Sequence, residues 1–106
     1  MKERVPEPLR VLKVIHEYGE VKGRVALHRL IYTLQTNKGI NFGYRFINYS
    51  FGPYSKELEE DLKLLESLNL ITEVRGADSV VIKATKKGME VANSLGGDLK
   101  KWKVPI

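Results

Sequence analysis

The chain of 106 residues contains no cysteine and only two histidines, His16 and His28. Without thiols it has no disulfide, no thiolate zinc site and no cysteine nucleophile. The two histidines lack the spacing of metal ligands, so we expect each to be a hydrogen-bonded histidine at the surface or at the core boundary. Since no nucleophile–base pair or metal set is left, the sequence predicts a protein that is not an enzyme, with no metal and no cofactor.

The chain also has no run of about 18 apolar residues, which predicts that no segment spans a membrane. Its first ten residues, MKERVPEPLR, lack the apolar stretch of a signal peptide, so we expect a cytoplasmic protein with no membrane partner. Hydrophobic residues make up 42% and charged residues 29%, which is typical of a folded chain. We expect one domain over residues 1–97 and a basic tail over residues 98–106.

The net charge of +5 is unevenly distributed. Residues 1–50 hold nine Lys or Arg and four acids, and residues 73–106 hold seven and four. Residues 51–72, between them, hold two and five, so this segment is acidic. A basic balance in a small domain favours an acidic partner such as nucleic acid.

Apolar spacing and end signals predict the order of the secondary-structure elements. Helices are expected on both sides of an extended aromatic segment, and a hairpin is expected before a last helix. The expected ranges are 7–18 and 22–36 for the first two helices, 40–51 for the extended segment, a third helix after Ser55, strands 71–75 and 79–84, and a last helix over 86–95 after Thr85. Three helices followed by a hairpin are the order of a winged helix-turn-helix domain.

The third helix combines a clear core face with many acids. At 100° per residue, Leu58, Leu62 and Leu65 share the core face. The opposite, exposed strip holds Lys56, Glu60, Lys63 and Ser67, whereas the flanks hold Glu57, Glu59, Asp61 and Glu66. The acidity is therefore mostly lateral, and it does not exclude contact of the exposed strip with DNA.

The segment INFGYRFINYSF, residues 40–51, is rich in aromatic residues. We favour a role in the core for these rings, although exposed rings would also stack on bases or form a dimer interface. The rings in question are Phe42, Tyr44, Phe46, Tyr49 and Phe51.

Two stretches resemble known families. TEVRGADSVVIKATKKGMEVANSL resembles the wing and final helix of winged-helix regulators. YRFINYSFGPYSKELEEDLKLLESLNLI, with VALHRLIYTLQ before it, is similar to archaeal winged-helix proteins and to the SocA-like (Panacea) antitoxin-associated domain. The resemblance covers about residues 10–95. It implies a mainly α (α+β) winged helix-turn-helix with a two-stranded β wing and an extra extended segment before the third helix.

In such a fold the start of the third helix faces a DNA groove and the wing lies along the backbone. The groove candidates are Tyr54, Ser55, Lys56, Glu60 and Lys63. A glutamate is compatible with this role because it accepts from cytosine N4. The phosphate candidates are Arg24, Arg29, Arg75, Lys83, Lys86 and Lys87. The alternative for the strip of the third helix is a solvated face, and for Lys86 and Lys87 an ordinary first turn, although a helix dipole disfavours cations there.

We therefore expect a protein that binds double-stranded DNA, a transcriptional regulator acting as a homodimer. The helix over residues 7–18 and the tail with Trp102 are the candidates for the dimer interface. The alternative is a protein-interaction module, antitoxin-like or an assembly adaptor, because an acidic third helix suits a basic protein partner.

Overall fold

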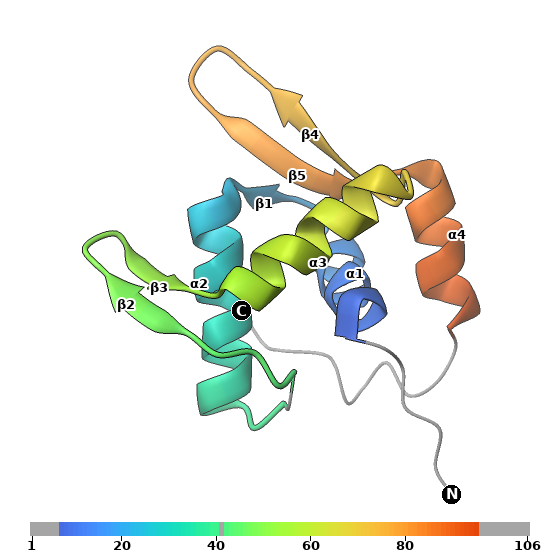
Figure 1. Ribbon diagram of the computed structural model, residues 1–106. Helices are drawn as coiled ribbons and strands as arrows, with labels where there is room; N and C mark the ends of the chain where they lie inside the picture. Colours follow the sequence, from blue (N-terminus) through green and yellow to red (C-terminus); the bar gives the residue numbers. More distant parts are fainter. Residues whose placement is uncertain (1–6, 41, 96–106) are drawn as a thin grey trace, which may run out of the picture.

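The computed structural model describes residues 7–40 and 42–95. They form an α+β domain with four helices and two small antiparallel sheets (Figure 1). None of these helices is long and apolar enough to cross a bilayer. The elements are α1 (Glu7–Tyr18), β1 (Val21–Lys22), α2 (Arg24–Asn37), β2 (Ile47–Tyr49), β3 (Gly52–Tyr54), α3 (Lys56–Ser67), β4 (Ile71–Arg75), β5 (Val80–Ala84) and α4 (Lys86–Ser94).

A three-stranded sheet with the order β1-β5-β4 contains the predicted hairpin. The short strand β1 was not expected, since the second helix was predicted to start at Lys22. Gly23 has a φ of 90°, which ends β1 and lets α2 begin one residue later. Val21 pairs with Ile82, and both side chains are buried, so β1 extends the core face of the hairpin.

The first helix lies in the interior of the domain and packs against α3, α4 and β5. Val11, Leu12, Val14 and Ile15 are each at most 1% exposed. The expectation that this helix offers a dimer interface is not met, because its apolar side chains are already covered by the chain itself. Trp102, the other candidate, lies outside the described residues.

The segment between α2 and α3 differs most from the sequence prediction. In place of one extended stretch, the chain forms a second hairpin in which Ile47 pairs with Tyr54 and Tyr49 with Gly52. Gly52 belongs to β3 with a φ of 127°, a value that favours glycine. Figure 1 shows this hairpin extending from the helical body and leading directly into α3.

The end of α3 and the start of α4 form one tightly packed junction. Asn69, at a φ of 61°, ends α3, and the Leu70 N–H bonds the Leu65 carbonyl at 2.9 Å, as in a Schellman cap. Thr85 caps α4, as expected, by accepting from the Gly88 N–H at 2.9 Å. Gly88 lies so close to this turn that a Cβ there would be 1.9 Å from the Leu70 carbonyl oxygen. The two helix ends therefore approach each other only because residue 88 has no side chain.

We predict that Gly88→Ala destabilises the protein by about 1–3 kcal/mol, the usual cost of overpacking. This loss occurs although alanine is intrinsically the better helix former. The measurement is urea unfolding followed by circular dichroism. Gly76→Ala is the control, because a Cβ there meets its nearest atoms at 3.7 Å. Equal stability of Gly88→Ala and the wild type would contradict the proposed close contact.

Candidate nucleic-acid interface

The outer strip of α3 is exposed as its periodicity predicts. Lys56, Glu60, Lys63 and Ser67 are all exposed, whereas Leu58, Leu62 and Leu65 are fully buried. Ser55 precedes the helix as its N-cap and accepts from the Leu58 N–H at 3.2 Å. The helix thus presents two lysines, with one glutamate between them, to solvent.

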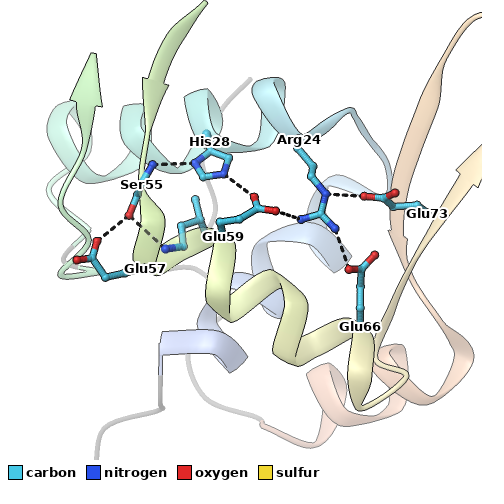
Figure 2. Close-up of polar contacts among 8 residues, drawn as sticks. Arg24, His28, Ser55, Glu57, Glu59, Glu66 and Glu73 are labelled. Atoms are coloured by element: carbon cyan, nitrogen blue, oxygen red, sulfur yellow. Dashed lines mark hydrogen bonds and ion pairs between the residues drawn. The ribbon is translucent and has the colours of Figure 1, made fainter. Parts of the chain in front are cut away.

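Arg24, at the start of α2, binds carboxylates from three places in the chain (Figure 2). Its Nη1 lies 2.7 Å from Glu59, its Nη2 2.8 Å from Glu66, and its Nε 2.7 Å from Glu73 of β4. Partial burial opposes the charged form, but the three carboxylates outweigh it and raise the pKa of Arg24 above its ordinary value. The guanidinium predicted to contact DNA phosphate is therefore occupied by the protein's own acids.

His28 is buried, contrary to the expectation of a surface or boundary position. Its Nδ1 accepts from the Ser55 N–H at 3.1 Å, so the neutral ring carries its proton on Nε2, which lies 3.1 Å from Glu59 (Figure 2). Burial lowers the pKa of His28 below its usual value of 6.5, against an opposing effect of Glu59. A second proton would place two N–H donors face to face at Ser55, so this arrangement requires the neutral ring.

The remaining flank acids of α3 also have partners within the protein. Asp61 accepts from the Tyr44 hydroxyl at 2.6 Å, and Glu57 accepts from the Ser55 hydroxyl at 3.1 Å. The acidic side chains on the flanks of α3, which argued against DNA binding, thus form contacts within the protein. Because Arg24 supplies one positive charge to three carboxylates, two negative charges remain in this cluster.

The structure does not bring all the predicted phosphate-binding residues to one face. In the β4–β5 hairpin, Arg75 pairs with Val80 on the face that carries Glu73, whereas Lys83 pairs with Thr72 on the opposite face. Since Glu73 reaches Arg24 beside α3, Arg75 shares the α3 side of the hairpin and Lys83 does not. Arg29 is exposed and donates to the Phe51 carbonyl at 3.2 Å.

The two lysines at the start of α4 differ from each other. Lys87 donates to the Leu68 carbonyl at 3.2 Å, at the C-terminal end of α3. A cation is favoured there by the dipole of α3, which explains why it is tolerated in the first turn of α4. Lys86 is exposed and has no such contact among the described residues, so of these two lysines it is the one that can meet a phosphate as predicted.

The aromatic segment is divided between core and surface. Phe42 and Tyr44 are buried as expected, whereas Tyr49 and Phe51 are 49% and 47% exposed. Tyr54, predicted to enter a groove, instead stacks on His28 with ring centroids 4.5 Å apart. The sequence around this segment has a further charge pattern: residues 21–56 contain six Lys or Arg and no acid.

An open hollow of about 190 Å³ lies between α2 and the β2–β3 hairpin, next to the Arg24 cluster. Its lining residues are Arg24, Val25, His28, Phe51, Tyr54 and Glu59. Within residues 7–40 and 42–95, no group of His, Asp or Glu side chains has the arrangement of a metal site. The hollow therefore offers aromatic and apolar walls with a few polar groups at one end.

Comparison of the chain with models of known protein families, with curated proteins and with solved structures finds no match.

We predict that Arg24→Gln lowers the free energy of unfolding by about 1–3 kcal/mol, because three neighbouring carboxylates lose their common partner. The loss should be smaller in high salt, which screens the repulsion among these carboxylates. Urea unfolding at neutral pH measures both effects. Arg75→Gln removes the same charge from an exposed strand end and serves as the control. Equal effects of the two substitutions would contradict the structural role of Arg24.

We predict that the stability contributed by neutral His28 is complete above the unfolded-state pKa and decreases as the pH falls below it. The sign follows because the folded-state pKa lies below 6.5, so the unfolded chain takes up this proton first. Unfolding free energies measured between about pH 7.5 and 5.5 should fall for the wild type and less for His28→Gln. His16→Gln is the control for histidine removal. A slope unchanged in His28→Gln would show that other groups cause the pH dependence.

Proposed function

We propose that this protein is a winged helix-turn-helix protein that binds double-stranded DNA and regulates transcription. The element order supports this fold: α1, β1, α2 and α3 precede the β4–β5 hairpin, and β1 completes the sheet beside β5. In this proposal α3 is the recognition helix and the β4–β5 hairpin is the wing. A two-fold dimer on paired half-sites remains part of the proposal, with an interface outside α1.

The observation that carries the proposal is the internal use of the acids on α3. Glu59 and Glu66 bind Arg24, Asp61 binds Tyr44, and Glu57 binds Ser55, all on the flanks of the helix. Lys56 and Lys63 remain exposed on the outer strip. Because the flank acids bind within the protein, this helix exposes lysines to solvent, and exposed cations are what contact with phosphates requires.

The structure refines the list of contacts in this proposal. Lys56, Lys63, Arg75 and Lys86 are assigned to phosphates, and Glu60 to a base edge as an acceptor from cytosine N4. Arg24, Tyr54 and Ser55 are removed from the list, because the first binds three carboxylates, the second stacks on His28 and the third caps α3. Lys83 is removed because it lies on the opposite face of the wing.

We predict that Lys56→Gln combined with Lys63→Gln weakens binding to a labelled duplex and lowers the slope of log affinity against log salt by about 1.8, since each phosphate contact contributes about 0.9. Fluorescence anisotropy over a range of salt concentrations measures the slope. Lys22→Gln is the control, because its side chain lies on the sheet face opposite to buried Val21.

The proposal is wrong if the wild type shows no duplex binding tighter than about 10⁻⁴ M at about 50 mM salt, the weak end of non-specific affinity. A slope that falls equally in Lys22→Gln would show that net charge, and not the strip of α3, determines binding.

A second candidate function is a protein-interaction module, which two exposed leucines on α3 favour. Leu64 and Leu68, one turn apart, are 45% and 47% exposed and flank the outer strip. They lie on the flank opposite to Glu59 and Glu66 and suit an apolar surface of a protein partner. Leu64→Ser with Leu68→Ser should leave duplex binding unchanged if they serve a protein partner, and anisotropy decides this.

A further inference from the structure

The tip of the β2–β3 hairpin presents two aromatic rings whose planes are parallel. Tyr49 and Phe51 have centroids 5.4 Å apart and an interplanar angle of 5°. About half of each side chain is exposed, at 49% and 47%. Exposed apolar side chains that lie next to one another are typical of interaction sites. The two rings stack on each other, and a further flat ring can extend this stack, which we call the platform.

This platform is held in place by contacts with half-buried Tyr54 and with Arg29. Tyr54 meets both rings edge-on, at 5.9 Å from Tyr49 and 6.3 Å from Phe51, and stacks in turn on buried His28. Arg29 donates to the Phe51 carbonyl and so fixes the backbone of the turn. The rings are therefore oriented before any ligand arrives, which reduces the entropy lost on binding.

The charge around the platform indicates the class of ligand. Residues 21–56, which include α2 and both strands of the hairpin, contain no acid and six basic residues. Two of these six residues are exposed and lie near the hairpin. Arg29 donates to the Phe51 carbonyl, and Arg45 lies two residues before the start of β2. Aromatic rings interspersed with arginine are the combination that binds unpaired nucleic-acid bases, and Glu59, the acid that lines the adjoining hollow, is paired with Arg24.

We propose that the β2–β3 hairpin binds an unpaired base of DNA by stacking it on the Tyr49–Phe51 platform. The open hollow of about 190 Å³ beside Phe51 gives the base room between the hairpin and α2. This inference rests on the proposed function and deepens it: α3 and the wing bind the duplex, while the hairpin selects DNA in which a base leaves the stack. Such selection gives preference for mismatched or locally opened duplex over fully paired duplex.

The test compares two labelled duplexes of equal length and charge, one fully paired and one with a short central mismatch bubble, by fluorescence anisotropy. The wild type should bind the bubble about 5- to 100-fold more tightly, the range expected for stacking of one base. Phe51→Ala with Tyr49→Ala should abolish this preference and leave binding to the paired duplex unchanged. Phe51→Trp should retain the preference, and its added fluorescence should be quenched more by the bubble than by the paired duplex.

Ile47→Ala is the matched control, because Ile47 lies on the same hairpin and is 61% exposed but has no ring. If it weakens bubble binding as much as the aromatic variants, the hairpin acts as a general apolar surface and the proposal is overturned. Circular dichroism and urea unfolding confirm that each variant is folded. A variant that fails to fold is replaced by the single substitution Tyr49→Leu, which must also lose the preference.

The remaining outcomes separate this inference from the proposed function. Paired duplex bound without any preference for the bubble would overturn the inference and leave the duplex-binding proposal intact. Bubble bound in a Phe51-dependent manner without measurable binding of paired duplex would support the inference and overturn the duplex-binding proposal. No binding of either DNA would overturn both.

Discussion

One guanidinium, that of Arg24, determines how the surface elements are arranged. It joins α2 to α3 through Glu59 and Glu66, and to β4 through Glu73. Without it, three carboxylates from two elements would face one another and repel. Because Glu73 belongs to the β4–β5 hairpin, the same contact fixes this hairpin relative to α3. The relative placement of the two elements proposed to meet DNA therefore depends on a side chain that itself is unavailable to DNA.

The polar contacts continue from Arg24 to the other hairpin. Glu59 lies within hydrogen-bonding distance of both Arg24 and His28, and His28 accepts from the Ser55 N–H at the junction of β3 with α3 (Figure 2). Tyr54, one residue before this junction, stacks on the same imidazole. Both hairpins are thus oriented against α3 by one continuous set of charged, aromatic and hydrogen-bonding groups. The long segment between α2 and α3 is thereby held against α2 as well as joined to α3.

The sequence correctly predicted the features that depend on residues close together in the chain, namely the buried helix face and the helix caps. The spacing of Leu58, Leu62 and Leu65 indicated the buried face of α3 correctly, and Ser55 and Thr85 were recognised as caps. The contacts of Arg24 join residues that are 35 to 49 positions apart in the chain, such as Arg24 with Glu59 and Arg24 with Glu73. No periodicity of the sequence predicts such contacts. The strand β1 is two residues long and exists only because β5 pairs with it, so it too required the tertiary structure.

The charge of the Arg24 cluster limits what α3 can contribute to DNA binding. Three carboxylates against one guanidinium leave two negative charges beside the helix, and exposed Glu60 lies between Lys56 and Lys63. The attraction to phosphates exerted by these two lysines is therefore largely offset in their immediate surroundings. In the proposed complex, further attraction comes from the cations around α3: Arg75 on the β4–β5 hairpin, Lys86 at the start of α4, and Arg29 and Arg45 near the β2–β3 hairpin. In the proposed complex, α3 would discriminate among sequences by its Glu60 acceptor, and the exposed cations of α3 and of the surrounding elements would supply the affinity.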